Sequence, residues 1–278
     1  MIVETVETEV LLEGLEFPEC PRWHDGRLWF SDVHAHLVMR VDLDGNADVV
    51  ADIGDRAAGL GFLPDGTPLV VSADRKLVLR IEDGVPAVHA DLSGLAVEWL
   101  NDMVVDEHGR AYVDAIAHVE DRGGDEPIDS IILVEPDGSW RLAATRALRP
   151  NGIAITPDGT TLLHASTRRR KVMQWSIEGD GTLTSPEVWA DTGRWTPDGL
   201  CLDAEGAVWI GGLAKQHFVR LRKGGEVERA IEVPGRWATA CTLGGRDRTT
   251  LFMATADPET KRGYIEIATV AVAGAGRP

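Results

Sequence analysis

Four side chains that stand far apart along the chain have the chemistry of a binding site for a hard metal ion. They are the carboxylates Glu19 and Asp198 and the carboxamides Asn101 and Asn151. Carboxylate and amide oxygens suit Ca²⁺, which takes about six to eight oxygen ligands, so four protein ligands leave room for water and a substrate. The sequence therefore predicts one divalent metal ion, with Ca²⁺ as the first choice and Zn²⁺, Mn²⁺ and Mg²⁺ as alternatives.

Glu19 lies in a stiff stretch, because Pro18 precedes it and Cys20-Pro21 follows it. Proline fixes its own φ and disfavours the helical conformation of the residue before it, so an extended segment is expected here. Glu19 is then either a solvated loop glutamate or a side chain aimed at a fixed point. Partners from the rest of the chain must decide between the two.

Short turns recur along the chain at a similar spacing. The turn glycines lie 40, 43, 50 and 47 residues apart, at Gly26, Gly66, Gly109, Gly159 and Gly206, and a sixth turn follows at Arg246-Asp247. Each turn leads into a run of aromatic and β-branched residues, and most copies continue into a second strand and a second turn. Each unit therefore reads as four short antiparallel strands.

Six such units in 278 residues give about 46 residues each, which is within the ~40–50 of propeller repeats. The predicted fold is all-β: a six-bladed β-propeller of four-stranded antiparallel blades, forming a single domain over residues 1–278. Residues 6–14 and 263–272 both have strand patterns, and we expect them to pair and close the ring. The four candidate ligands each stand directly before a predicted inner strand, so the propeller would bring them together at one end of the central channel.

Composition and charge limit the partners. The chain has 28 Lys and Arg residues and 45 Asp and Glu residues, which gives a formal charge of −17. This charge disfavours nucleic acid and anionic membranes as partners, because binding to either relies on clustered basic residues. The first residues are acidic where a signal peptide is basic, and no apolar run approaches the ~18 residues of a membrane span. Cys20, Cys201 and Cys241 suggest no disulfide framework. We expect a soluble cytoplasmic protein that is a monomer or a weak homo-oligomer.

An ordered set of motifs, from about residue 14 to residue 275, resembles the gluconolactonase, regucalcin and luciferin-regenerating enzyme family. The motifs are "FPECPRW", "WLNDMVVDEHGRAYV", "RPNGIAITPDG", "TPDGLCLDAEGAVWIGG" and "ATACTLGGRDRTTLFMATA". The resemblance implies that Glu19, Asn151 and Asp198 hold a divalent metal, and that Asn101 lines the same site as a ligand or a substrate contact. It also implies hydrolysis of a lactone, and more distant propellers of similar design hydrolyse organophosphate esters.

Two residues depart from the family pattern. Cys20 stands where the family usually has glycine, so it either packs quietly behind the metal, narrows the pocket or offers a thiol near the ion. Trp99 stands where sugar-lactone members can carry an arginine that contacts the substrate. Together with Trp195 and Trp237, Trp99 either packs between blades or makes the pocket aromatic, and an aromatic pocket suits a hydrophobic or aryl-bearing lactone or ester better than a sugar acid lactone.

The expected reaction is opening of a small-molecule lactone or ester whose carbonyl a metal polarises. Asp198 is the candidate general base, with attack by its own carboxylate as the alternative, and Asn101 and Asn151 would hold the ion and the carbonyl. His118 and His217 follow inner strands and could reach the substrate. Two other functions stay open: phosphotriester hydrolysis on the same metal site, and a calcium-binding propeller without catalysis. No GxSxG or HExxH motif supports a serine hydrolase or a zincin.

Overall fold

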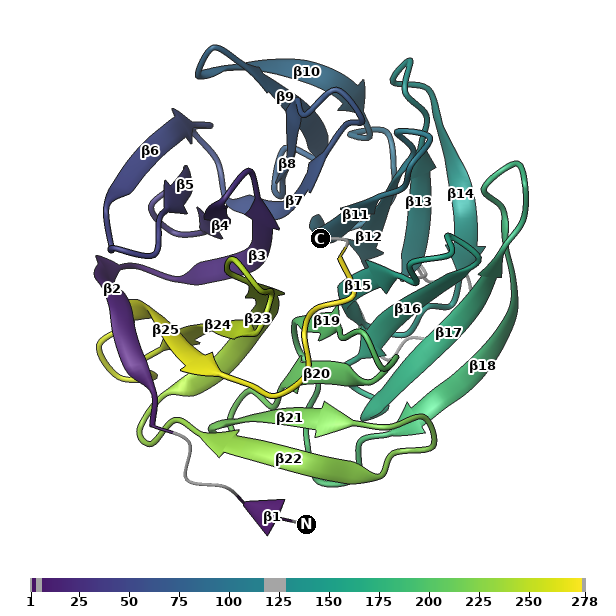
Figure 1. Ribbon diagram of the computed structural model, residues 1–278. Coiled ribbons are helices and arrows are strands. Elements are labelled where there is room, and N and C mark those ends of the chain that lie inside the picture. Colours follow the sequence, from purple (N-terminus) through teal and green to yellow (C-terminus); the bar gives the residue numbers. More distant parts are fainter. Residues whose placement is uncertain (1, 4–6, 118–128, 277–278) are drawn as a thin grey trace.

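The computed structural model describes residues 2–3, 7–117 and 129–276, and every regular element within them is a β-strand. The strands form six sheets arranged in a ring around a common axis (Figure 1). Each sheet contains four antiparallel strands in which chain neighbours pair, apart from the two rearrangements described below. The predicted all-β fold and six-bladed propeller are confirmed.

The blades follow one another along the chain. The first three are β3 (Pro18–His24), β4 (Arg27–Asp32), β5 (Leu37–Val41), β6 (Ala47–Asp52); β7 (Ala57–Phe62), β8 (Pro68–Ser72), β9 (Leu77–Glu82), β10 (Val85–Asp91); and β11 (Trp99–Val105), β12 (Ala111–Ile116), β13 (Ser130–Val134), β14 (Trp140–Thr145). The next two are β15 (Pro150–Ile155), β16 (Thr161–Ser166), β17 (Lys171–Ile177), β18 (Leu183–Asp191); and β19 (Leu200–Leu202), β20 (Val208–Gly211), β21 (His217–Leu221), β22 (Val227–Glu232). The first strand of each blade lies nearest the axis (Figure 1).

The last blade joins the two ends of the chain. It consists of β23 (Trp237–Gly244), β24 (Thr250–Ala256), β25 (Gly263–Thr269) and the N-terminal β2 (Glu9–Leu15), which pairs antiparallel with β25. The predicted closure is therefore confirmed, and it leaves no exposed edge on β25. The short β1 (Ile2–Val3) adds a parallel fifth strand to β22, which the repeat pattern did not predict.

The inner strands carry a bulge near their N-terminal ends. On β3, pairing with β4 moves from Glu19↔Ser31 to Arg22↔Trp29. The inner strand therefore advances by three residues where β4 advances by two. Equivalent register shifts occur on β7, β11, β15 and β23. A bulge breaks the strict alternation of side chains and redirects one of them. It is this irregularity that can point a side chain along the channel rather than into a blade.

Two glycines let neighbouring inner strands approach each other. Gly152 N–H donates to Asp198 O over 3.1 Å, and Gly199 N–H donates to Thr239 O over 2.8 Å. A Cβ added at Gly152 would lie 2.4 Å from the amide nitrogen of Leu200. Only glycine fits such a close backbone approach. The inner strands therefore form a hydrogen-bonded wall that holds the channel residues at fixed positions.

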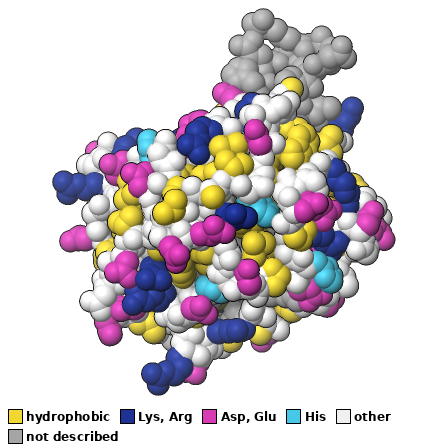
Figure 2. All heavy atoms as spheres, turned by 90° about the horizontal axis from the view of Figure 1, so that it is seen from above, with side chains coloured by type: hydrophobic (Ala, Val, Ile, Leu, Met, Phe, Trp, Pro, Cys, Tyr) yellow, Lys and Arg dark blue, Asp and Glu magenta, His cyan; other side chains and the backbone are white. Residues whose placement is uncertain are grey.

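The C-terminal segment crosses the channel end that lies opposite these bulges (Figure 1). Ala275 N–H donates to the carbonyl of Leu202, the last residue of β19, and Gly274 N–H donates to Arg248 O. On the outer face seen in Figure 2, acidic and basic side chains are interspersed with scattered apolar ones. None of the described segments is a helix of the length and apolarity that crossing a bilayer requires.

Candidate metal centre and substrate cavity

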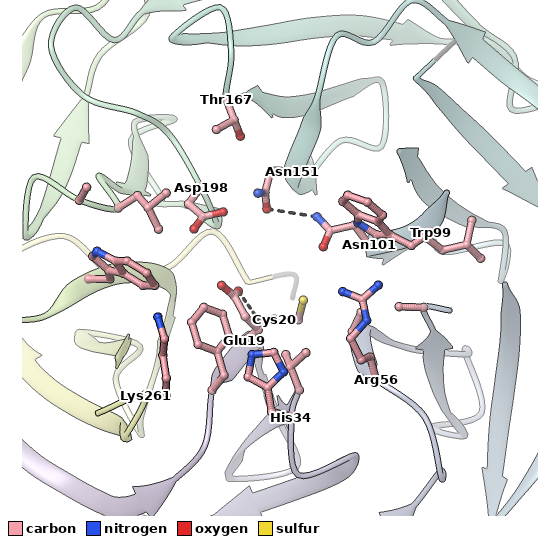
Figure 3. A pocket seen from close by; sticks show the side chains of 18 residues that line it. Glu19, Cys20, His34, Arg56, Trp99, Asn101, Asn151, Thr167, Asp198 and Lys261 are labelled. Carbon is pink, nitrogen blue, oxygen red and sulfur yellow. Dashed lines mark hydrogen bonds between the residues drawn. The ribbon is translucent and has the colours of Figure 1, made fainter. Parts of the chain in front are cut away.

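A cavity of about 510 Å³ opens at the N-terminal ends of the inner strands. All four predicted ligands line it: Glu19, Asn101, Asn151 and Asp198. Their side chains point toward one another from four blades (Figure 3). The sequence expectation that the ring would bring these residues together matches this geometry.

The ligands do not all stand before their strands, as the sequence pattern had suggested. Glu19, Asn101 and Asn151 lie within β3, β11 and β15 at the bulges, whereas Asp198 precedes β19. The segment leading to Glu19 is fixed by Asp32, whose carboxylate accepts the backbone N–H groups of Glu16 and Phe17. These three inner strands thus begin two or three residues earlier than predicted, because each bulge keeps its residue inside the ladder.

Burial makes the two carboxylates of the cavity hard to ionise. Burial first, and then the charges of Asp198 and Asp102, raise the pKa of Glu19 well above its usual value. Burial first, and then the charge of Asp102, raise the pKa of Asp198 to about 7. Two such acids at one point favour a bound cation, which would offset both charges. Hard carboxylate and amide oxygens therefore fit a divalent ion of the Ca²⁺ type.

The two amides are oriented by the hydrogen bond between them. Asn101 Nδ2 donates to Asn151 Oδ1 over 3.4 Å. The Asn101 oxygen consequently faces the cavity (Figure 3). Because the described residues contain no group of three or more His, Cys, Asp or Glu side chains suited to a metal, the candidate centre depends on these amide oxygens.

A charged layer that sequence reasoning missed lies behind the ligands. Arg22 and Asp102 form a buried ion pair with Nη2 and Oδ1 2.8 Å apart, and Arg22 also donates to Met103 O. Asp114 Oδ1 accepts the backbone N–H of Asp102, while Asp114 Oδ2 has no hydrogen-bond partner among the described residues. Burial raises the pKa of this carboxyl well above its usual value. The adjacency of Asn101 and Asp102 was the only sequence signal for this layer. Supporting groups of this kind orient ligand side chains.

Cys20 is buried in the cavity wall at 4% exposure. Its φ is 51°, in the left-handed region that favours glycine. Its N–H donates to Glu19 Oε2 over 3.2 Å. Burial first, and then Asp102, raise the pKa of the Cys20 thiol well above its usual value. Cys20 is therefore a neutral lining group rather than a reactive thiolate, and the chain's three cysteines are free.

Aromatic side chains form two walls of the cavity. Two guanidinium groups lie near the Trp99 ring, with Arg56 at 5.6 Å and Arg149 at 5.0 Å from the ring centroid. The ammonium nitrogen of Lys261 lies over the Trp237 ring, 4.5 Å from its centroid. These cations hold the indole rings in place and leave the remaining ring surface facing the cavity. The predicted aromatic character of the pocket is present at Trp99 and Trp237.

Two residues expected at the pocket lie outside the cavity lining. Trp195 is 3% exposed and packs in the apolar cluster between the blade that begins with β15 and the blade that begins with β19. Its ring centroid lies 5.0 Å from that of His217. His217 begins β21, the third strand of its blade, and is therefore displaced from the axis. His118 lies outside the described residues. These positions correct the expectation for Trp195 and His217: Trp195 precedes the inner strand β19 but packs in the core, and His217 follows β20, which is the second strand of its blade and not an inner strand.

Several lining residues carried no usable sequence signal. They are Phe17, His34, Arg56, Thr167 and Lys261. They come from loops between strands, whose lengths differ from blade to blade, so the repeat does not bring them into register. Only the neighbourhood of the "FPECPRW" motif could have indicated Phe17.

Comparison with known proteins identifies relatives. A family model described as the SMP-30/Gluconolactonase/LRE-like region matches residues 17–257. The chain is 23% identical to a 6-deoxy-6-sulfogluconolactonase of Pseudomonas putida over 84% of this chain and 81% of that protein. It is 24% identical to a pentonolactonase of Haloferax volcanii over 90% of this chain and 84% of that protein. A calcium-binding regucalcin of Agrobacterium tumefaciens superposes with a TM-score of 0.81 at 22% identity, covering 99% of both chains, and at this identity the likeness shows the fold.

Proposed function

The chain belongs to the SMP-30/gluconolactonase/LRE-like family, and on that premise we propose that it is a metal-dependent hydrolase that opens a lactone or a related carboxylic ester. The observation that carries the proposal is the meeting of four oxygen-bearing side chains from four blades in one cavity with aromatic walls. A scaffold has no need for two carboxylates and two amides gathered at one point, because holding like charges together away from water costs stability. Relatives named as lactonases support the same reaction class.

Glu19, Asn101, Asn151 and Asp198 would hold the ion. A bound divalent cation supplies polarisation of the substrate carbonyl and stabilisation of the oxyanion that forms. Ca²⁺ is the proposed metal because the donor set is entirely oxygen and the site offers two negative charges. The name of the regucalcin neighbour, a calcium-binding protein, agrees with this choice.

Asp198 is the proposed general base. It is buried, and its pKa of about 7 in the metal-free chain lies near the value at which a base works well at neutral pH. Its carboxylate would take a proton from the attacking water, and the proton would then pass to the departing ring oxygen. Asn101 would align the substrate through its amide, whose orientation the hydrogen bond to Asn151 fixes. Direct attack by the Asp198 carboxylate is the alternative route.

The proposed substrate is more hydrophobic than a sugar acid lactone. Trp99, Trp237 and Phe17 offer ring surface to the cavity, and such surface gains more from covering an aryl or alkyl group than from a polyhydroxylated ring. The resemblance to the family places Trp99 where sugar-lactone members can carry an arginine that contacts the substrate. The cavity of about 510 Å³ has the size of a small-molecule site.

A panel of substrates tests the proposal. The Ca²⁺-loaded protein is assayed on aryl-substituted and sugar acid lactones, aryl esters and phosphotriesters, with proton release followed at constant pH. We expect the highest kcat/KM on the aryl-substituted lactones. Faster turnover of phosphotriesters would favour the alternative hydrolase, and tight Ca²⁺ binding with no turnover of any compound would favour a calcium-binding propeller.

A further inference from the structure

Basic side chains gather on one side of the candidate cavity. Lys261, His34 and Arg56 form a row below Glu19 in the view of Figure 3. The chain has a formal charge of −17, yet the acidic side chains that line this cavity are confined to the ligand end, at Glu19 and Asp198. The cavity is therefore acidic at the proposed metal and basic along one wall.

The two strong cations of this wall differ in their partners. Arg56 is engaged, because Nε donates to Asp74 Oδ2 over 2.8 Å and the guanidinium stacks on Trp99. Hydrogen bonding to Asp74 also raises the pKa of Arg56. Lys261 forms no ion pair with any residue that the structure describes, and its ammonium lies 4.5 Å from the Trp237 ring centroid. Of these two cations, Lys261 is therefore the one whose charge is available to pair with an anionic ligand.

The loop that carries Lys261 is closed by its own hydrogen bonds. The carboxylate of Asp257 accepts the N–H groups of Glu259 and Thr260, at 2.8 and 2.9 Å. The main chain adds Asp257 N–H to Arg262 O and Lys261 N–H to Asp257 O, at 2.8 and 3.0 Å. The base of the Lys261 side chain is therefore held in position, which reduces the entropy that binding a ligand would cost.

We propose that Lys261 binds a carboxylate on the substrate, so that this cavity selects an amphipathic lactone with an acidic group remote from the ring carbonyl. The inference rests on the proposed lactone hydrolase function. The carbonyl lies at Glu19 and Asp198, the apolar body lies along Trp99 and Trp237, and the carboxylate meets the ammonium group. An ammonium partly desolvated by an indole ring gains more from such a pair than a fully solvated one.

Space for the acidic end is present next to this lysine. A second hollow of about 640 Å³ begins at Lys261 and His34, which line both spaces. Its lining also carries two acids, Glu13 and Glu16, against the single further cation Arg262, so an anion gains less there than beside Lys261. The carboxylate is therefore held at the junction, where Lys261 faces it, and a longer substituent can continue into the hollow.

Binding of two unreactive analogues tests the assignment. The analogues are lactams with the same aryl body, one ending in a carboxylate and the other in a carboxamide, and their affinities for the Ca²⁺-loaded protein are measured by calorimetry. We expect the wild type to prefer the carboxylate by about fivefold to tenfold, the range of a partly exposed ion pair. Lys261→Met should lose this preference, and Lys261→Arg should keep most of it.

Arg262→Met is the matched control, because it removes the same charge from the next residue, which lines only the second hollow. It should leave the preference unchanged. Equal affinities in the wild type, a preference that survives Lys261→Met, or a preference lost in Arg262→Met would each overturn the assignment to Lys261. The matching lactones separate the two proposals: carboxylate-selective binding without ring opening would contradict the hydrolase and leave the Lys261 assignment standing.

Discussion

At the scale of single residues, the raised pKa values of the two cavity carboxylates indicate a compensating cation. Glu19 and Asp198 are both held in the cavity with raised pKa values, which costs stability unless a cation compensates. The ion pair of Arg22 and Asp102 does not serve this purpose, because Arg22 is engaged by Asp102 and by the carbonyl of Met103. A divalent metal ion would neutralise both carboxylates at once.

Glu19→Gln should weaken Ca²⁺ binding by about tenfold to a hundredfold or more, because it keeps the shape of the side chain and removes one of two charges at the ion. Calorimetric titration of the metal-free protein measures the effect. Glu16→Gln is the control, since it removes the same charge from an exposed residue outside the ligand set. Unchanged Ca²⁺ affinity in Glu19→Gln would remove this residue from the proposed centre.

The meeting of Glu19, Asn101, Asn151 and Asp198 in one cavity could be predicted from the sequence, whereas most of the other lining residues could not. Glu19 and Asp198 each stand in a motif repeated in register with the turn glycines, so symmetry alone indicated a meeting point. Lys261 and His34 belong to loops that the repeat does not align. Trp195 and His217 show the opposite error, because proximity to an inner strand in sequence did not determine on which side of the strand the side chain packs.

At the scale of elements, irregularities position the site. The bulges on β3, β11 and β15 direct the ligands into the channel, and the alternating pattern of a regular strand cannot reveal them in advance. Gly152 permits the contact between β15 and the segment that leads into β19. The strand pairs themselves were predictable because each has a turn glycine and a β-branched or aromatic run.

A buried histidine on β16 makes the stability of its blade depend on pH. His164 is fully buried, its Nε2 faces Ala147 O at 3.0 Å, and its Nδ1 accepts the Trp175 Nε1–H bond at 2.9 Å. This arrangement requires the neutral ring, and burial lowers the pKa of His164 from 6.5 to about 4. Between these two values the unfolded chain binds the extra proton, so the free energy of unfolding falls as the pH falls, by on the order of 3 kcal/mol across the window.

Chemical denaturation of the wild type and His164→Gln at several pH values tests this linkage. The variant will be less stable at pH 7, but its free energy of unfolding should decline less between pH 6.5 and 4, since the titrating ring is gone. His108→Gln removes a side chain that is 63% exposed and should follow the wild-type curve. Equal pH slopes for the wild type and His164→Gln would contradict a neutral buried ring.

At the scale of the whole molecule, ring closure should make folding cooperative. β2 covers the edge of β25 and brings Leu15, Leu11 and Leu12 to the apolar cluster between the first and last blades. The sequence predicted this closure because both end segments have strand patterns. It did not predict β1 or the crossing of the C-terminal segment, since neither belongs to the repeat.

Removal of β2 should open the ring. A chain that begins at residue 16 loses β2 and should have a thermal midpoint lower by about ten degrees or more, or no cooperative transition at all. A chain that begins at residue 8 loses β1 and keeps β2, and it should unfold close to the full-length protein. Calorimetry of the three chains measures the difference, and equal midpoints for the chains beginning at residues 8 and 16 would show that closure does not stabilise the propeller.

The central claim is that the four-ligand cavity hydrolyses lactones with a bound metal and Asp198 as the base. The most direct test is kcat/KM for an aryl-substituted lactone, measured for the wild type before chelation, after chelation and after Ca²⁺ is returned, and for Asp198→Asn with its metal content determined. We expect chelation to abolish hydrolysis, Ca²⁺ to restore it, and metal-loaded Asp198→Asn to be slower by about a hundredfold or more. Hydrolysis at the wild-type rate by the chelated protein, or by metal-loaded Asp198→Asn, would contradict the central claim.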